Sequence, residues 1–462
     1  MKSKLWSMIS MVAIVMIFIT ACGGSQTPTQ SAAQPTTGGA AFQSTEVAAS
    51  ATGAASQSTG AAASTGKTLT ILVEGGGHQL QQPIADLFEK ETGNKVNFVE
   101  VPYAQVYDKL SAEMSSGGSS YDVATVDVIW LPRFAQFAEP LDSLFTNDVK
   151  NDLFPALVQD AQANGHFIGM PQWANAEILF YRKDLFGDPK EQAAFKAKYG
   201  YDLQPPKTWQ QFIDAAQFFT RTNNGQTTLY GTDAKGAVET EWLAEVLQAG
   251  SPGVVLDKDG KIIIDNPAHV QALQFDADLH CKYNVTPPNA NEIDWNLAQN
   301  LFYQGQTAMM LFWAHAYHLT PQDSKVADKV GVAPMIAGPG GMAAIPGPWY
   351  NIVPSTGQNK DLAMQYVKFA YDHNDLGIQA PLGLAARKSA YQKYMNQPGY
   401  EHFGPLVETL NAPKTMGRPL VANWQEITDQ VLVPTVQEAL QCKQSPQDIL
   451  SAAAKKIQGM QP

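Results

Sequence analysis

The sequence contains only three cysteines, Cys22, Cys281 and Cys442, and none of them has the close spacing of a metal or redox motif. Beyond the N-terminal region it has no apolar run long enough to predict a membrane-spanning helix. It also lacks an excess of positive charge, because 43 acidic residues outnumber 31 basic ones. This balance argues against nucleic acid as a partner, since nucleic acid favours basic surfaces. The formal net charge of -12 fits a soluble extracytoplasmic protein instead.

The motifs of several common catalytic classes are missing. The chain has no Gly-x4-Gly-Lys, no His-Glu-x-x-His and no Gly-x-Ser-x-Gly. Residues 75–77 are three glycines after a predicted strand, but they lack dinucleotide-binding spacing and predict a loop with a close backbone approach. Residues 257–260 begin like a calcium loop, yet Lys261 takes the place of an oxygen ligand, so we expect a turn. His315 and His318 have no third ligand nearby in the sequence and are interpreted as core or rim residues.

The N-terminal residues have the layout of an export signal. Lys2 and Lys4 precede an apolar stretch that is too short for a comfortable membrane span. Residues 19–22, Ile-Thr-Ala-Cys, resemble the bacterial lipobox, whose cysteine is acylated and becomes the mature N-terminus. An uncut signal anchor is the alternative. We predict a lipoprotein signal peptide over residues 1–21 and an extracytoplasmic protein that a lipid on Cys22 anchors to the cell membrane.

A segment of very low charge and low apolar bulk follows Cys22. Residues 23–66 are almost wholly Ala, Ser, Thr, Gly, Gln and Pro, and Glu46 is their only charged residue. Such a composition cannot offset its conformational entropy by burial, so residues 22–66 are predicted to be a disordered, lipid-anchored tether. A flexible chain of about 44 residues has a root-mean-square span of roughly 35–40 Å, enough to reach a partner in the same membrane.

The body of the chain starts with alternating strands and helices. Residues 69–73, 95–101 and 121–126 read as strands, and helical patterns separate them, the first of which ends at Gly93. This alternation predicts an α/β fold with a largely parallel sheet and helices on both faces. Ligands of such sheets bind at the carboxyl ends of the strands. Residues 74–78 and residues 127–130 directly follow the first and the third predicted strand and lie at that edge.

Later elements are predicted from capping signals and short apolar runs. Thr208 is expected to cap a helix, with Gln211 completing a capping box. Residues 262–264 read as a strand, and a last helix is expected to start after Ser445.

Cys281 and Cys442 remain after the tether. Outside the cytoplasm they could form a disulfide, which the loop-entropy model would credit with about 4–5 kcal/mol at most. Two separately buried thiols are the preferred interpretation.

Eight tryptophans lie beyond the signal, and several stand beside planar polar residues. A single tryptophan is more often a core residue than a ligand contact, and Trp209, at a helix start, is interpreted as structural. Aromatic rings can cover the apolar face of a sugar, while carboxylates and amides bind its hydroxyls. The pairs that suggest this arrangement are Trp130 with Asp127, Trp173 with Asn175, Trp242 with Glu241, and Trp349 with Asn351.

Seven segments carry a resemblance to a known family: residues 84–93, 121–131, 169–173, 179–186, 302–310, 347–352 and 360–369. In this order they resemble the extracellular solute-binding proteins (family 1) of sugar-type ABC importers, the group of maltose- and trehalose-binding proteins. Arg387 is left out of the predicted site, because the proline and threonine that commonly precede this arginine in the family are absent.

The resemblance implies a two-lobed periplasmic-binding-protein fold of type II, in which each lobe has a mixed, mostly parallel sheet flanked by helices. Lobe 1 would comprise residues 67–173 and 346–398, and lobe 2 residues 174–345 and 399–462. A ligand would bind in a cleft between the lobes, with the tryptophans stacking on it and Asp127, Glu241 and His78 binding hydroxyls. The predicted ligand-binding residues are His78, Asp127, Trp130, Trp173, Glu241, Trp242, Trp313, Trp349 and Trp424.

The resemblance also implies a receptor without catalytic residues, metal or cofactor. It would capture a sugar, expected to be a di- or oligosaccharide, and deliver it to the membrane permease of an ABC transporter, acting as a monomer. Two alternatives remain at this point: a surface glycoside hydrolase or lyase that uses a pair such as Asp127 and Glu241, and the same fold with a non-sugar solute.

Overall fold

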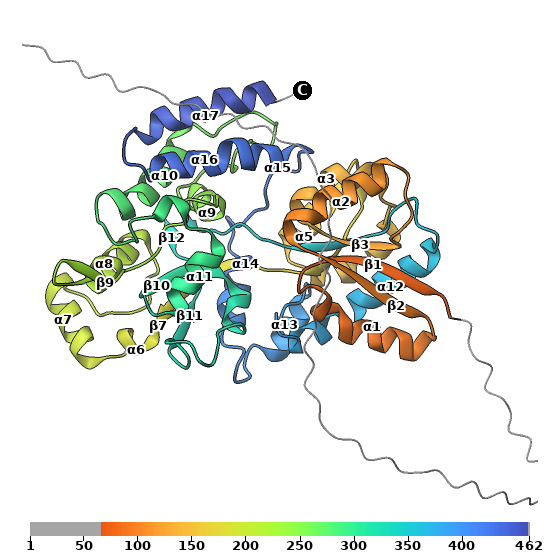
Figure 1. Ribbon diagram of the computed structural model, residues 1–462, viewed down its shortest axis with the longest axis horizontal. Helices are drawn as coiled ribbons and strands as arrows, with labels where there is room; N and C mark the ends of the chain where they lie inside the picture. Colours follow the sequence, from red (N-terminus) through yellow and green to blue (C-terminus); the bar gives the residue numbers. More distant parts are fainter. Residues whose placement is uncertain (1–65, 461–462) are drawn as a thin grey trace, which may run out of the picture. The chain divides into compact units, whose positions relative to one another are not determined.

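A computed structural model describes residues 66–460 of the chain (Figure 1). The predicted signal peptide, Cys22 and the predicted tether up to residue 65 lie outside the described residues. Within residues 66–460, no helix is both long enough and apolar enough to cross a membrane.

The first sheet has five strands in the order β2-β1-β3-β14-β6. Strand β1 pairs in parallel with β2 and β3, whereas β14 lies between β3 and β6 and runs antiparallel to both. All residues of the central strand β3 are buried, as expected for a strand covered on both faces. The strands are β1 (Thr68–Glu74), β2 (Lys95–Val101), β3 (Val123–Asp127), β6 (Met170–Trp173) and β14 (Trp349–Ile352).

Three long helices flank this sheet: α1 (His78–Thr92), α2 (Tyr103–Ser115) and α12 (Lys360–Asp372) (Figure 1). The inner face of α1 buries Ile84 and Phe88, and the Phe88 ring meets the edge of Tyr366 from α12 at 5.2 Å between centroids. Gly93 ends α1 with a φ of 72°, a conformation that glycine adopts without steric cost. The predicted strands and this helix are therefore confirmed.

The second sheet has three strands in the order β10-β7-β11. They are β7 (Glu177–Arg182), β10 (Met309–Trp313) and β11 (Val330–Ala333), and both outer strands run antiparallel to β7. The expectation of mostly parallel pairing therefore holds for β1, β2 and β3 but is wrong for this sheet. Two successive parallel strands need a crossover connection, such as a helix. The much longer connections before β10 and β14 allow either strand direction, so the alternation of strands and helices does not predict it.

The helices around the second sheet include α8 (Trp209–Phe219), α9 (Thr240–Gln248), α10 (Pro267–Cys281) and α11 (Trp295–Tyr303). Thr208 caps α8 as predicted, because its Oγ1 accepts from the Gln211 backbone nitrogen over 3.3 Å. The Gln211 side chain accepts from the backbone of Lys207 rather than that of Thr208. Trp209 stacks on Phe275 at 4.4 Å, which agrees with its structural interpretation.

The shorter elements connect the two sheets and their helices. Residues 257–261 form the expected turn, since Asp257 Oδ1 accepts from the backbone nitrogens of Asp259 and Lys261. The strand predicted at residues 262–264 reduces to a single bridge between Leu256 and Ile262. The remaining bounds are α3 (Leu131–Phe134), α4 (Asn147–Asp152), α5 (Pro155–Asp160), β4 (Gln162–Ala163), β5 (His166–Phe167), α6 (Lys183–Phe186), α7 (Pro189–Tyr199), β8 (Arg221–Asn223), β9 (Gln226–Leu229), β12 (Ala337–Gly338), β13 (Gly341–Met342), α13 (Lys388–Tyr394) and α14 (Phe403–Leu410).

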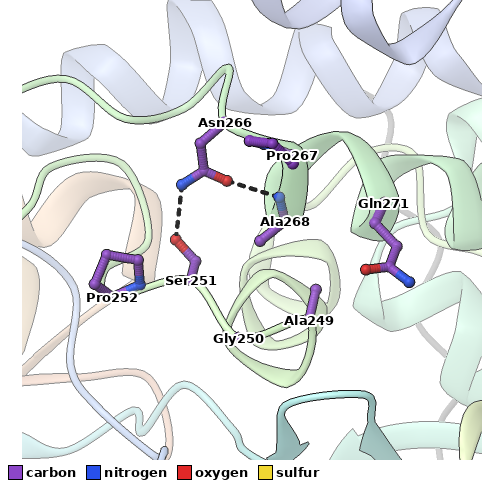
Figure 2. Close-up of a pocket in the computed structure, with 8 residues that line it drawn as sticks. All are labelled: Ala249, Gly250, Ser251, Pro252, Asn266, Pro267, Ala268 and Gln271. Atoms are coloured by element: carbon purple, nitrogen blue, oxygen red, sulfur yellow. Dashed lines mark hydrogen bonds between the residues drawn. The ribbon is translucent and has the colours of Figure 1, made fainter.

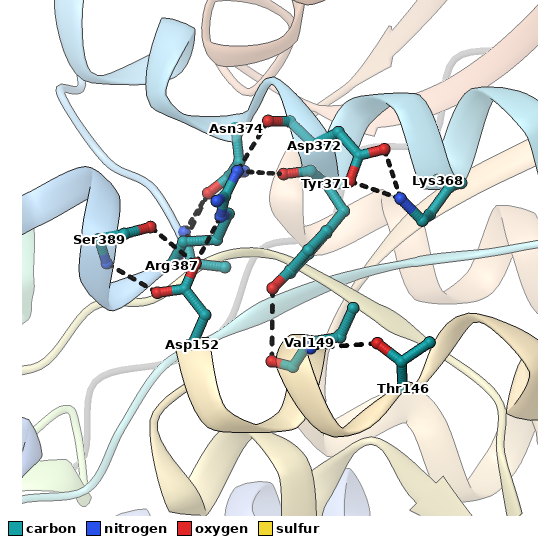
Figure 3. Close-up of polar contacts among 10 residues, drawn as sticks. Thr146, Val149, Asp152, Lys368, Tyr371, Asp372, Asn374, Arg387 and Ser389 are labelled. Carbon is teal, nitrogen blue, oxygen red and sulfur yellow. Dashed lines mark hydrogen bonds and ion pairs between the residues drawn. The ribbon is translucent and has the colours of Figure 1, made fainter.

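Arg387 makes structural contacts at the start of α13 (Figure 3). Its Nε donates to Asp152 Oδ2 over 2.7 Å, and one terminal nitrogen donates to the Asp372 backbone oxygen over 2.7 Å. Ser389 donates to the same Asp152 carboxylate from its backbone and its hydroxyl. Arg387 thus joins the ends of α4 and α12 to α13.

The chain ends in α15 (Trp424–Ile427), α16 (Val433–Ala439) and α17 (Pro446–Met460), and a disulfide joins this region to α10. The bond links Cys281, the last residue of α10, to Cys442 after α16, with 5.7 Å between the Cα atoms. The preference for two separate thiols was wrong. Helix α10 packs against both α16 and α17, and this long-range packing, which the sequence does not reveal, brings the two cysteines together.

Replacing both cysteines, Cys281→Ser with Cys442→Ser, should lower the free energy of unfolding by about 4 kcal/mol, because the bond closes a loop of 161 residues. Urea denaturation at neutral pH measures the change. A reducing agent should shift the wild-type midpoint toward that of the variant and leave the variant unchanged. Two cysteines that react with a thiol reagent in the native wild-type protein would contradict the bond.

Candidate functional site

Four aromatic side chains meet beside the first sheet and form what we call the aromatic surface: Tyr103, Trp130, Trp173 and Trp349. The Trp349 ring lies 5.4 Å from Trp173 in a stacked arrangement and 5.7 Å from Trp130 at a steep angle. Tyr103 lies 5.2 Å from Trp130 and is 40% exposed, so part of its ring is open to a ligand. Sequence reasoning found the three tryptophans but not Tyr103.

The strand pairing explains why these residues converge. Trp349 is the first residue of β14 and pairs with Asp127, the last residue of β3, on one side. On the other side it pairs with Trp173, the last residue of β6. Trp130 ends the short helix η1 (Val128–Trp130) that follows β3 directly. The carboxyl ends of β3 and β6 therefore deliver a carboxylate and two indoles to the amino end of β14.

Asp127 is a buried carboxylate beside the aromatic surface. It accepts from the Tyr103 hydroxyl and from the Ile129 backbone nitrogen, each over 3.2 Å. Burial raises the pKa of Asp127, while the charge of Arg418 and these hydrogen bonds act in the opposite direction. A carboxylate with few partners can accept hydrogen bonds from the hydroxyls of a ligand.

Arg418 brings a buried positive charge to Asp127. It comes from the segment between α14 and α15, donates to the Pro346 backbone oxygen over 3.2 Å, and is only 7% exposed. Its Nε is buried and has no hydrogen-bond partner. Its charge lowers the pKa values of Asp127, Asp160 and Glu239 against the opposing effect of burial. One guanidinium charge therefore favours the ionised form of three carboxyl groups, while its Nε–H is not used in a hydrogen bond.

The neighbouring Gly417 lets this segment approach Asp160 closely. A Cβ atom at Gly417 would lie only 2.4 Å from Asp160 Oδ2, so a larger residue would force the carboxylate or the chain to move. Burial raises the pKa of Asp160 to about 7, against the charge of Arg418.

The end of β1 supplies a second polar group near Asp127. Burial, together with the charges of Asp127 and Glu100, raises the pKa of Glu74 to about 8, so this carboxyl holds a proton at neutral pH. His78 Nδ1 lies 2.7 Å from Glu100 Oε1, and the backbone nitrogen of Gly76 donates to the same oxygen. Glu100 thus binds both His78, the first residue of α1, and the glycine loop (residues 75–77) after β1.

The glycine loop also approaches the aromatic surface. A Cβ atom at Gly77 would lie 3.2 Å from Trp173 Cη2 and 2.7 Å from Val73 Cγ2, so only glycine fits without displacing them. The predicted close backbone approach is confirmed at Gly77.

Two further predicted residues, Trp424 and Trp313, do not touch the aromatic surface themselves but lie next to residues that are bonded to it or close to it in the chain. Trp424 is fully buried in α15, which packs against η1, and the adjacent Gln425 accepts from Trp130 Nε1 over 3.2 Å. Trp313 lies against Gly347, two residues before Trp349, and its ring would be 2.8 Å from a Cβ atom there. These contacts join β10 and the C-terminal helices to the residues around Trp349.

Glu241 and Trp242 have different surroundings. Trp242 is 1% exposed, and its ring lies 6.2 Å from His269, between α9 and α10 rather than at the aromatic surface. Glu241 forms an ion pair of 2.7 Å with Lys235. Lys235 also pairs with Asp233 over 2.9 Å. The role of Glu241 and Trp242 as ligand contacts stays a prediction.

Lys235 is the centre of a buried group that we call the Lys235 cluster; its members are Glu177, Asp233, Lys235, Glu241, Glu245 and Asp276. Both oxygens of Glu177 are buried without a hydrogen-bond partner. Burial opposes the charged form of Lys235, but Asp233 and Glu241 raise its pKa, so it stays positive. Burial and then the charge of Glu241 raise the pKa of Asp276 to about 7. Five carboxyl groups thus share one cation, and some of them hold protons at neutral pH.

Away from the aromatic surface and the Lys235 cluster, the described residues offer little to hold a ligand or a metal ion. A hollow of about 450 Å³ lies between the end of α9 and the start of α10 (Figure 2). Its side chains are small and uncharged, and Asn266 uses its amide to bind Ala268 and Ser251. Among the described residues, no group of three or more His, Cys, Asp or Glu side chains has an arrangement that could hold a metal ion.

Sequence reasoning missed Tyr103 and Arg418, and it placed Glu74 at a ligand-binding strand end without including it among the predicted site residues. Glu74 ends β1 and Tyr103 follows β2, so both occupy the strand ends where ligands of such sheets bind, and this signal was available. Arg418 lies in a loop with no periodic pattern, and only the folded chain brings it to Asp127.

The sequence matches the family described as bacterial extracellular solute-binding protein over residues 73–374, which is more than half of the chain. The chain belongs to this family. A probable ABC transporter-binding protein of Deinococcus radiodurans is 32% identical over 301 residues, which cover 62% of this chain and 67% of that protein.

Two solved structures of similar proteins share the fold. Maltose-bound MalE3 of T. maritima is 28% identical, with a TM-score of 0.69 over 85% of this chain and 100% of that one. A solute-binding protein of Thermotoga lettingae bound with α-D-tagatose is 25% identical, with a TM-score of 0.69 over 85% of this chain and 98% of that one. The chain thus has the two-lobed, type II periplasmic-binding-protein fold, and members of its family bind solutes outside the cytoplasm.

The Lys235 cluster should make this solute-binding protein more stable in acid than in mild base. Asp276 ionises near 3.8 when unfolded and near 7 when folded, so between these values the folded state holds an extra proton and loses stability as the pH rises. Asp276→Asn should therefore reduce the difference in unfolding free energy between pH 5 and pH 8 by on the order of 1–3 kcal/mol.

Urea denaturation at both pH values measures this difference. Asp323→Asn, at an exposed carboxyl group, is the control and should leave the pH dependence unchanged. An equal pH dependence in wild type and Asp276→Asn would show that Asp276 does not hold the extra proton.

Proposed function

We propose that this protein is the sugar-binding component of an ABC importer and binds its ligand on the aromatic surface. The observation that carries the proposal is the position of Asp127 beside Trp130 and Trp349, with the positive charge of Arg418 acting on this carboxyl group. Indole rings cover the apolar face of a sugar, the carboxylate accepts from its hydroxyls, and the free Arg418 Nε donates to a hydroxyl oxygen.

The ligands of similar proteins support a sugar. The T. maritima relative was solved with maltose and the Thermotoga lettingae relative with α-D-tagatose. A di- or oligosaccharide is the expected ligand, and several of its sugar rings could be matched by the four aromatic rings; Tyr103, 40% exposed, is the ring most open to it, while Trp130, Trp173 and Trp349 are at most 7% exposed. His78, Glu241, Trp242, Trp313 and Trp424 complete the proposed set of ligand-binding residues, in which Trp313 and Trp424 are supported by their links to Trp349 and Trp130.

We further propose that residues 67–173 and 346–398 form lobe 1 and residues 174–345 and 399–462 form lobe 2. The sheet membership supports this division, because every strand of the first sheet falls in the first set and every strand of the second sheet in the second. Gln425, from lobe 2, accepts a hydrogen bond from Trp130 of lobe 1, and the charge of Arg418, also from lobe 2, acts on Asp127 of lobe 1. The ligand would favour the closed arrangement, in which both lobes touch it.

The closed, loaded protein would then dock on the membrane permease of the transporter as a monomer. Membership of an extracellular solute-binding family supports an extracytoplasmic location. A lipid on Cys22 would hold the protein at the cell membrane, and the segment up to residue 66 would give it the reach to meet the permease.

Sugars that bind this protein should raise its melting temperature. A ligand that binds only the folded state raises the melting temperature by mass action, so one or more sugars in a panel from monosaccharides to maltotetraose should raise it for residues 67–462. Chromatography of the same mixtures should return each sugar uncut. No shift with any sugar at millimolar concentration would contradict the proposal, and cleavage products would indicate a glycosidase.

The second prediction concerns the aromatic surface. Trp349→Ala should weaken the binding of the sugar found in that panel by about 1–3 kcal/mol, because it removes the ring that contacts both Trp130 and Trp173. Titration calorimetry measures the affinity. Trp209→Phe, which changes a tryptophan that stacks on Phe275 in the core, is the control and should bind normally. Unchanged affinity in Trp349→Ala would place the ligand elsewhere.

A further inference from the structure

The pairing of β14 with β6 is irregular at one residue. Trp349 pairs with Trp173, but the next residue of β14, Tyr350, pairs with Pro171. One step along β14 therefore corresponds to two residues of β6, and Gln172 is the extra residue of a β-bulge.

This bulge determines the direction in which the Trp173 side chain points. Residues directly opposite each other on paired strands project from the same face of the sheet. With the bulge, Trp173 stands opposite Trp349, and the two rings stack at 5.4 Å with 23° between their planes. In a regular ladder, Gln172 would stand opposite Trp349, and Trp173 would point to the other face.

Hydrogen bonds hold the bulge residue at both its side chain and its backbone. Gln172 is 3% exposed, and its Oε1 accepts from Asn351 Nδ2 over 2.9 Å. Its backbone oxygen accepts from Asn374 Nδ2 over 2.6 Å. These two bonds come from β14 and from the segment after α12, so Gln172 is fixed from two separate parts of the chain.

The two asparagines are themselves held in place. Asn351 Oδ1 accepts from the Thr125 hydroxyl of β3 over 2.7 Å, and Thr125 in turn accepts from Gln81 of α1 over 2.8 Å. Asn374 Oδ1 accepts from the Ala386 backbone nitrogen over 2.5 Å, close to the contacts of Arg387 (Figure 3). The amides behind the tryptophan pair thus form a connected, buried network, which favours one arrangement of the strand ends.

We propose that Gln172 is a positioning residue for ligand binding: as the bulge residue held by Asn351 and Asn374, it turns Trp173 onto Trp349 and so completes the aromatic surface. The role of this surface in binding rests on the function proposed above. The orientation of the two rings does not, and it can be measured without a ligand.

The test uses Gln172→Met, which keeps the length and flexibility of the side chain but replaces the amide by a weak acceptor. Gln172→Glu is the conservative variant, because its carboxylate can still accept from Asn351. Stacked indoles give an exciton couplet in far-ultraviolet circular dichroism, and the difference between wild type and Trp173→Phe isolates the couplet of the Trp173–Trp349 pair.

We expect the couplet to fall by at least about half in Gln172→Met and to persist in Gln172→Glu, while both proteins unfold cooperatively. The affinity for the sugar that stabilises the wild type should fall about tenfold in Gln172→Met, in the range expected when an aromatic stacking contact is lost. A couplet of wild-type size in Gln172→Met would overturn the positioning role.

A second variant keeps the inference testable if Gln172→Met does not fold. Asn374→Asp retains the acceptor for Ala386 and removes the donor to the Gln172 backbone, so it should also reduce the couplet. An undiminished couplet in that variant would overturn the role equally. If the wild-type protein binds no sugar, the proposed function fails, but the couplet still decides whether Gln172 positions Trp173.

Discussion

Strand β14 lies between β3 and β6 and pairs with both, although more than 170 residues separate it from either in the sequence. This pairing places Trp349 opposite Asp127 on one side and Trp173 on the other. The indole pair, the carboxylate and the segment of Pro346 that Arg418 contacts all follow from where β14 enters the sheet. By pairing with two strands that precede it by more than 170 residues, β14 therefore brings together Asp127, Trp173 and Trp349 of the proposed site.

Two buried cations organise the charges of the protein in a similar way. Arg418 faces Asp127, Asp160 and Glu239, and the Lys235 cluster surrounds a lysine with five carboxyl groups. In both places the carboxyl groups outnumber the cation, and burial raises the pKa of several of them. A carboxyl group that holds a proton can donate a hydrogen bond as well as accept one. The interior is thus richer in donors than its many acidic residues suggest.

The sequence was sufficient to predict features that depend on local patterns. Short apolar or alternating runs marked β1 to β3, Gly93 marked the end of α1, and a strand end pointed to Asp127 and Trp130. The family resemblance supplied the two-lobed fold, and matches to a family and to solved structures agree with that fold.

The missed features depend on contacts between distant parts of the chain. Arg418 sits in a loop without periodicity, and its importance arises only because it reaches Asp127. The bulge at Gln172 is invisible in the sequence, since an extra residue in a strand is defined only by its partner strand. The same holds for the antiparallel neighbours of β7 and for the disulfide, which required α10 to pack against α16.

The disulfide also dictates an order of events during biogenesis. Cys442 lies after α16. When it emerges from the synthesis and export machinery, α17 is the one described helix that has still to follow. Cys281 must therefore remain a free thiol while the next 161 residues, up to Cys442, follow. The packing of α10 against α16 and α17, which brings Cys281 next to Cys442, can take place only after these C-terminal helices have been made. Because every described strand precedes Cys442 in the sequence, the bond between the end of α10 and the segment after α16 can form only after the last of these strands has been made.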